Sequence, residues 1–153
     1  MTPETMTDTA CTTIVREIEI RARAAKIFAA ITEPDQLTQW WGTDDTYRCT
    51  GMEVDFRVGG KWRTVGRGTD GKAFAVEGEY RVIDPPRVLE YTWRHDWGDR
   101  PNDLDTIVRY ELDERDGVTH LRVVHSGFVD MKSRDDHDGG WVRVLGWLRD
   151  FVE

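Results

Sequence analysis

The chain has 153 residues, 39% of them apolar and 33% charged, and a net charge of −8, which is a size and composition typical of one globular domain. This acidic balance without a dense basic patch argues against nucleic-acid and anionic-membrane partners, because both are held by clustered lysines and arginines. No apolar run approaches the roughly 18–20 residues of a membrane span.

The N-terminus is polar and rich in threonine, with no apolar core of a secretion signal. We therefore expect residues 1–11 to be a disordered leader, followed by a single domain over residues 12–153 of a cytoplasmic protein. The two cysteines, Cys11 and Cys49, form no CxxC motif, which favours unrelated thiols in a reducing compartment over a disulfide or a zinc site.

The first part of the domain predicts a strand and two short helices. Isoleucines alternate with polar residues over 14–20, so this strand has one buried face. Arg16 interrupts that face, either with its guanidinium reaching water at a sheet edge or as a cation directed into a cavity. Apolar spacing predicts a helix over 24–31, and Pro34 starts a second helix over 35–40 that ends at Gly42.

From residue 52 to residue 126 the pattern predicts about six antiparallel strands with one apolar face each. Glycine-containing steps at 59–60, 69–71 and 116–117 mark turns between them, and 98–104 reads as a polar loop. The strand faces expected to point inward carry Met52, Val54, Phe56, Val58, Phe74, Val76, Tyr80, Leu89, Tyr91, Trp93, His95, Val108, Tyr110, Leu112, Leu121, Val123 and His125.

The C-terminal stretch has the apolar spacing of an amphipathic helix, at Trp141, Val144, Leu145, Leu148, Phe151 and Val152. Its start lies somewhere within 130–140, since Gly139 and Gly140 weaken a helix by roughly 1 kcal/mol each. If the helix extends further back, His137 shares the face of Trp141. A curved antiparallel sheet laid against this helix buries both apolar surfaces, which gives an α+β fold.

A series of short motifs resembles a known family in its order and spacing. They are Arg16–Ala22, Ile27-Phe28, Thr32-Glu33-Pro34, Trp40-Trp41-Gly42, the stretch from Phe56 to Trp62, Gly78-Glu79-Tyr80, Pro85-Pro86-Arg87, the stretch from His125 to Phe128, and Gly140-Trp141. Together they resemble the SRPBCC superfamily of START-like, helix-grip proteins, and within it the branch of homologues of the activator of heat-shock-protein ATPase (Aha). The chain departs from this pattern at Arg23, where the family usually has proline, and in the acidic insert 130–138.

The resemblance implies a helix-grip fold, with a curved antiparallel β-sheet wrapped around the long C-terminal α-helix and two short helices after the first strand. It also implies a cavity between sheet and helix, where many members hold apolar or aromatic small molecules. Some members are cyclases or other non-redox enzymes, and one branch assists a chaperone ATPase. The fold alone does not choose among these functions.

Parity along the strands places many aromatic rings where such a cavity would lie. The predicted ligand-binding residues are Trp40, Trp41, Phe56, Trp62, Tyr80, Tyr91, Trp93, His95, Tyr110, His125, Trp141 and Leu145. The competing interpretation is a packed aromatic core with only a small void. Each of the two histidines is either a satisfied polar residue at a strand end or an anchor that orients a ligand.

We expect a binding protein, monomeric or weakly dimeric, that holds an apolar or aromatic small molecule and needs no cofactor. One alternative is an enzyme that uses His95 or His125 with Arg16 or Tyr110 as acid, base or oxyanion partner. Another is a cofactor of a chaperone ATPase. The acidic run 135–138 is better explained as a solvated segment near a helix N-terminus than as a metal site.

Overall fold

The computed structural model describes residues 13–43, 45–95, 106–128 and 130–153. Its elements are β1 (Ile14–Ile20), α2 (Ala24–Thr32), α3 (Pro34–Trp40), β2 (Gly42–Thr43), β3 (Tyr47–Val54), β4 (Lys61–Gly68), β5 (Ala73–Asp84), β6 (Val88–His95), β7 (Thr106–Arg115), β8 (Val118–Ser126) and α4 (Met131–Val152). The predicted leader 1–11, Cys11 and the polar loop 98–104 lie outside the described residues.

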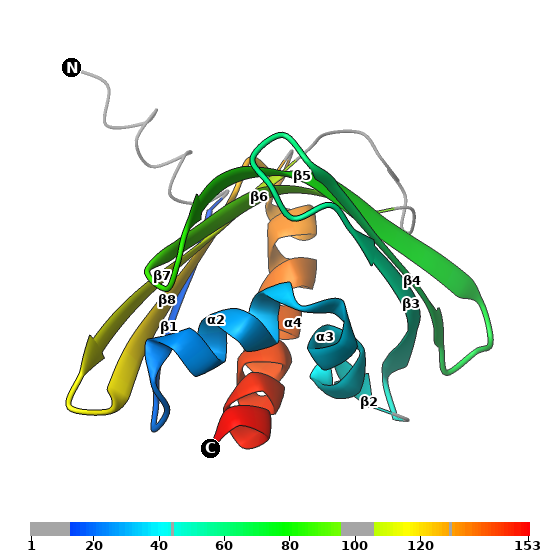
Figure 1. Cartoon of the computed structure of the whole chain (residues 1–153). Coiled ribbons are helices and arrows are strands. Elements are labelled where there is room, and N and C mark those ends of the chain that lie inside the picture. Colours follow the sequence, from blue (N-terminus) through cyan, green and yellow to red (C-terminus); the bar gives the residue numbers. More distant parts are fainter. Residues whose placement is uncertain (1–12, 44, 96–105, 129) are drawn as a thin grey trace.

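The eight strands form one antiparallel sheet in the order β1-β8-β7-β6-β5-β4-β3-β2. Each strand pairs with its neighbour in sequence except β1, which pairs with β8. The sheet is strongly curved, α4 runs along its concave side, and α2 and α3 lie against α4 (Figure 1). The predicted α+β helix-grip fold is confirmed, including the two short helices after the first strand.

The inward faces follow the alternation expected from the sequence. On β7, Val108, Tyr110 and Leu112 are buried, and on β8 Leu121 and Val123 are fully buried. Asp116 and Gly117 both have positive φ in the turn between these strands, as a tight two-residue hairpin requires. Regular pairing on both sides keeps this parity, so apolar side chains collect on the concave face.

Helix α4 begins earlier than its apolar pattern alone indicates. The carboxylate of Asp130 accepts a hydrogen bond from the amide of Ser133 at 2.9 Å, which satisfies one of the free amides of the first turn. The helix then continues through Gly139 and Gly140 to the buried face formed by Trp141, Val144, Leu145, Leu148 and Val152. His137 therefore shares the helix face of Trp141.

A bidentate ion pair attaches the N-terminal half of α4 to β1. The Arg16 guanidinium donates two hydrogen bonds of 2.8 Å to the Asp138 carboxylate, and Arg134 lies 3.5 Å from the same group. The Arg16 side chain is 42% exposed, so it extends along the sheet edge toward water. Its guanidinium charge is paired with the Asp138 carboxylate of α4. The acidic insert is thus part of the helix.

One strand prediction is wrong. β3 ends at Val54, and Phe56 and Val58 lie in the turn that leads to β4, where they are 43% and 61% exposed. Gly60 closes this turn so tightly that a Cβ there would lie 2.0 Å from the carbonyl oxygen of Asp55. Backbone turning therefore ends the alternation two residues before Phe56.

Candidate functional site

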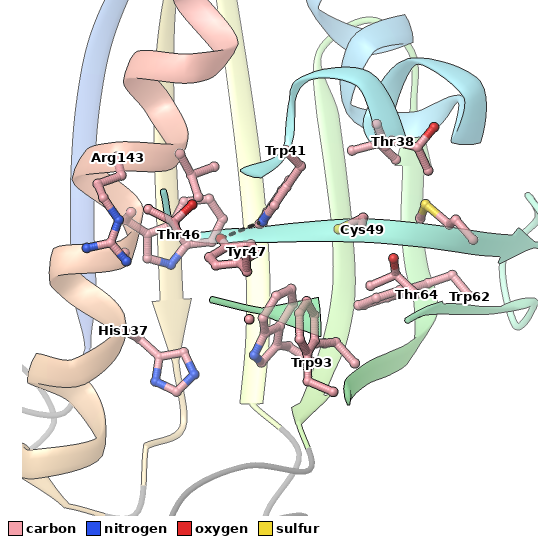
Figure 2. Close-up of a pocket in the computed structure, with 18 of the residues that line it drawn as sticks. Thr38, Trp41, Thr46, Tyr47, Cys49, Trp62, Thr64, Trp93, His137 and Arg143 are labelled. Carbon is pink, nitrogen blue, oxygen red and sulfur yellow. Dashed lines mark hydrogen bonds between the residues drawn. The ribbon is translucent and has the colours of Figure 1, made fainter. Parts of the chain in front are cut away.

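A cavity of about 650 Å³ lies between α4 and the part of the sheet formed by β3, β4 and β5 (Figure 2). Its walls are mainly apolar and aromatic. They consist of Ile31, Leu37, Thr38, Trp41, Thr46, Tyr47, Cys49, Met52, Trp62, Thr64, Gly68, Thr69, Asp70, Lys72, Ala73, Phe74, Val76, Tyr80, Tyr91, Trp93, His125, Asp136, His137, Gly140, Trp141, Arg143 and Val144. This volume falls within the range of small-molecule sites.

Tryptophans from three different elements form a continuous aromatic wall. Trp41 follows α3, Trp62 lies on β4 and Trp93 on β6. The rings of Trp41 and Trp93 are stacked with centroids 6.2 Å apart, and Trp62 lies 5.8 Å from Trp93. Because each ring is fixed by its neighbour, the wall offers a rigid apolar surface to a planar or aliphatic guest.

Seven of the twelve predicted ligand-binding residues line the cavity: Trp41, Trp62, Tyr80, Tyr91, Trp93, His125 and Trp141. Their contact with a ligand stays a prediction. The other five, Trp40, Phe56, His95, Tyr110 and Leu145, do not belong to its wall.

Four of these five residues have other positions in the fold, and His95 lies beside His137. Trp40 is buried and donates its indole N–H to the carbonyl of Ala30 at 2.8 Å, while Leu145 is a core residue of α4. Tyr110 lies behind the wall, with its hydroxyl 2.8 Å from that of Tyr91. Phe56 borders a separate surface groove beside α2.

His125 is held at both ring nitrogens. Nδ1 accepts a hydrogen bond of 3.0 Å from the indole N–H of Trp141, so the proton of the neutral ring lies on Nε2 and is donated to Thr106 Oγ1 at 2.7 Å. The Thr106 hydroxyl in turn donates to the carbonyl of Trp93 at 3.0 Å. This chain of three bonds fixes one tautomer and joins α4, β8, β7 and β6.

Three histidines gather at this end of the cavity. His137 on α4 lies between the other two, with ring centroids 5.4 Å from His125 and 5.1 Å from His95. Burial lowers the pKa of His125 well below its usual value, and the neighbouring His137 and His95 lower it further. Burial also lowers the pKa of His137, so both His125 and His137 favour the neutral form.

Three of the groups proposed for an enzymatic mechanism are engaged by other side chains among the described residues. Arg16 pairs with Asp138, the Tyr110 hydroxyl bonds to Tyr91, and both nitrogens of His125 are engaged. A general base needs a nitrogen or oxygen free to reach the substrate. In this arrangement Arg16, Tyr110 and His125 hold and orient neighbouring side chains.

The cavity wall also includes residues that were not among the twelve predicted ligand-binding residues, such as Tyr47, Cys49, Met52, Thr64, His137 and Arg143. Tyr47 and Cys49 alternate with exposed Arg48 and Thr50, a period-two signal that precedes the first strand we assigned in this region. A bulge between Cys49 and Gly51 then shifts the inward parity to Met52 and Val54. This alternation could have revealed Tyr47 and Cys49.

The surroundings of two polar side chains on β3 raise their pKa values. Burial raises the pKa of the Cys49 thiol, with a smaller opposing effect from its hydrogen bond to Thr64, which keeps it protonated near neutrality. Burial also raises the pKa of the Tyr47 hydroxyl. This hydroxyl oxygen accepts a 3.0 Å hydrogen bond from the Trp41 indole, shown as a dashed line in Figure 2.

Two indole N–H groups are buried without an acceptor among the described residues, those of Trp62 and Trp93. The Trp62 ring lies across Gly78, the residue it pairs with on β5, and a Cβ at Gly78 would lie 2.8 Å from Trp62 Nε1. An unmatched buried donor costs about 1–3 kcal/mol.

Among the described residues, no group of three or more histidine, cysteine, aspartate or glutamate side chains is placed to hold a metal ion. Within the same part of the chain, none of the helices combines the length and apolar character of a membrane crossing.

The family model described as Activator of Hsp90 ATPase homolog 1-like protein matches residues 21–153. The chain belongs to this family. The resemblance found from the sequence motifs is therefore confirmed, whereas among curated proteins none matches this sequence at a significant level.

Solved structures of bacterial proteins have the same fold. A protein from Chromobacterium violaceum is similar with a TM-score of 0.80 and 25% identity over 93% of this chain and 97% of that chain. A protein from Arthrobacter aurescens has a TM-score of 0.79 and 19% identity over 95% and 88% of the two chains. The AHSA1 protein from Silicibacter pomeroyi has a TM-score of 0.76 and 23% identity over 90% and 95%.

Proposed function

We propose that this member of the Aha homologue family is a cytoplasmic binding protein that holds an apolar or aromatic small molecule in the cavity beneath α4. The observation that carries the proposal is the cavity itself, with about 650 Å³ of space against the rigid wall of Trp41, Trp62 and Trp93. Removing apolar surface of a ligand from water contributes about 25 cal/mol per Å².

The binding test uses the uncharged fluorescent probe N-phenyl-1-naphthylamine. We expect saturable enhancement of its fluorescence, and at least about tenfold weaker binding by Trp93→Ala, because that change removes an aromatic contact and its buried area. The matched control is Phe56→Ala, since Phe56 is an exposed aromatic residue outside the cavity wall. Circular dichroism checks that both variants are folded.

A second measurement locates the probe. In a Cys11→Ser background, bound probe should slow alkylation of Cys49 by iodoacetamide, since Cys49 lines the cavity. Absence of probe binding, together with no displacement or thermal shift across lipids, polyketides and aromatic compounds, would argue against a ligand-binding role. Probe binding that is unaffected by Trp93→Ala and leaves Cys49 reactive would place the probe elsewhere on the protein.

A second candidate function is assistance to a chaperone ATPase, which the description of the family suggests. The feature that favours it is the pair of exposed apolar side chains, Phe56 and Val58, beside the groove that runs between α2 and Pro85-Pro86. Stimulation of the ATPase rate of purified Hsp90, and its loss on Val58→Asp, would support this role. An unchanged ATPase rate would contradict it.

A further inference from the structure

Among the described residues, arginines on the outer side of the sheet form ion pairs with carboxylates, whereas an arginine at the cavity does not. On the outer side, Arg109 bridges Glu90 and Glu111, and Arg122 pairs with Glu111. On α4, Arg134 pairs with Asp135 and Asp138. In the described part of the chain, Arg143 lines the cavity from an exposed position of α4 and forms no ion pair with a carboxylate.

A second hydrogen-bond donor, the hydroxyl of Tyr47, lines the same cavity as Arg143. Figure 2 shows Arg143 on α4 and Tyr47 on β3, on different walls of the same pocket. Tyr47 is held in place by edge contacts with Phe74 at 5.6 Å and with Trp147 of α4 at 5.9 Å. The guanidinium of Arg143 lies close enough to favour negative charge at the Tyr47 oxygen.

The hydrogen bond from Trp41 defines what the Tyr47 hydroxyl offers to a guest. Since the indole N–H is a donor only, the Tyr47 oxygen accepts it, and the hydroxyl proton is left to be donated. Burial raises the Tyr47 pKa, so this proton is present at neutral pH. Tyr47 and Arg143 together present hydrogen-bond donors and one positive charge, which is the complement of an anionic acceptor.

The acidic residues of the cavity wall do not cancel this site. Asp136 is seven residues before Arg143, about 10 Å away along the helix axis at 1.5 Å per residue. The Asp70 carboxylate accepts the amide of Lys72 at 2.9 Å within the turn between β4 and β5. Lys72 also lines the cavity, and its positive charge offsets the negative charge of Asp70 in the same turn, so the two side chains add no net charge to that side.

We propose that the ligand is an amphipathic carboxylate, with its apolar body against the tryptophan wall and its carboxylate held by Arg143 and Tyr47. This inference rests on the proposed small-molecule binding and adds the chemical class of the ligand. The apolar body supplies most of the affinity, and the carboxylate fixes the orientation and selects against neutral and cationic analogues.

The test compares matched pairs of ligands by displacement of N-phenyl-1-naphthylamine at low salt and pH 7.5. The aromatic pair is 2-naphthoate and 2-naphthalenemethanol, and the aliphatic pair is dodecanoate and dodecan-1-ol. We expect the carboxylate of at least one pair to bind about five- to tenfold more tightly than its alcohol, the range for a partly exposed charge-assisted contact. The pair that shows the larger preference identifies the source of the ligand as aromatic or aliphatic.

Variants assign this preference to the two residues. Arg143→Gln should abolish it while leaving the affinity for the alcohol unchanged, and Tyr47→Phe should weaken carboxylate binding severalfold. Arg149→Gln is the matched control, because it removes the same charge from another exposed position of α4, one that lies outside the cavity wall. Added salt should reduce the preference in the wild type and have little effect on Arg143→Gln.

The possible outcomes separate the carboxylate assignment from the binding function on which it rests. Equal affinity of acid and alcohol in both pairs would overturn the carboxylate assignment and leave the binding function intact. A preference that survives Arg143→Gln, or one that Arg149→Gln removes equally, would also overturn it. Failure of every probe to bind would overturn both proposals.

Discussion

Trp141 on α4 donates its indole N–H to Nδ1 of His125 on β8 at 3.0 Å, which is a direct polar bond between the gripped helix and the sheet. Both partners are buried, with Trp141 4% and His125 0% exposed. The bond forces the His125 proton onto Nε2, where Thr106 accepts it. One helix residue thereby determines the tautomer of a sheet residue and positions the end of the cavity.

Trp141→Phe keeps an aromatic ring at this position but removes the N–H donor together with part of the buried ring volume. His125 Nδ1 would then be buried without a partner, so we expect the free energy of unfolding to fall by about 1–3 kcal/mol. Urea denaturation followed by circular dichroism measures this change. Trp147→Phe, on the same helix but partly exposed, is the control and should cost less. An equal loss in both variants would show that ring packing, and not the hydrogen bond, is what Trp141 provides.

How much of this arrangement follows from the sequence depends on the regularity of each strand. Trp62, Tyr80, Tyr91 and Trp93 could be placed on the helix side because each lies in a paired strand where parity holds. Phe56 could not, because the chain turns after Val54. The partners of His125 come from β7 and α4, and no local pattern indicates which distant side chains will meet.

The start of α4 also could not be predicted from the local sequence alone. Two adjacent glycines weigh against a helix across 139–140 when only propensity is considered. The cap at Asp130 and the ion pair between Arg16 and Asp138 stabilise that segment, and both depend on tertiary structure or capping geometry. His137 could therefore be named as a possible cavity residue from the sequence, while its inclusion depended on contacts that only the structure shows.

The stability of the protein should fall as the pH decreases below about 6.5, the ordinary histidine pKa. The pKa values of His125 and His137 are lowered in the folded state, so the unfolded chain binds protons that the folded chain does not. Stability is complete above the unfolded pKa and is lost as the pH falls toward the folded values, by up to about 1.4 kcal/mol per pH unit for each histidine.

This pH dependence can be measured by urea denaturation between pH 5 and pH 8, with nitrogen-15 NMR of the imidazole rings to follow protonation. The His125 signal should stay that of a neutral ring protonated at Nε2 throughout this range. A His125 ring that titrates near pH 6.5, or a stability that is constant over this interval, would contradict the burial and bonding described above.

The ion pair between Arg16 and Asp138 should contribute up to about 1 kcal/mol, because Arg16 is 42% exposed and solvent screens the pair. A double-mutant cycle with Arg16→Gln and Asp138→Asn isolates this coupling, and Asp135→Asn is the exposed control. Arg16 lowers the Asp138 pKa, so this stabilisation is present above the unfolded value of about 3.9 and is lost as the pH falls through the folded value. A coupling near zero at pH 7 would mean that this ion pair contributes nothing to the attachment of α4.

Two glycine-to-alanine substitutions should change stability in opposite directions. At Gly78, a Cβ would lie 1.8 Å from the carbonyl oxygen of Thr92 and 2.8 Å from Trp62 Nε1, so the backbone of β6 or the indole must move. We expect Gly78→Ala to cost about 1–3 kcal/mol or more. It should also weaken binding of N-phenyl-1-naphthylamine, because displaced Trp62 would enter the cavity.

At Gly139, an exposed position of α4, a Cβ would meet no atom within 4 Å, so Gly139→Ala should stabilise the helix by about 0.5–1 kcal/mol and leave probe binding unchanged. Thermal or urea unfolding of both variants gives the two signs under identical conditions. If Gly78→Ala were as stable as the wild type and bound the probe equally well, the close packing of Trp62 across β5 would be excluded. In that case the aromatic wall would be adjustable, and ligand selection would depend on the polar groups Tyr47 and Arg143.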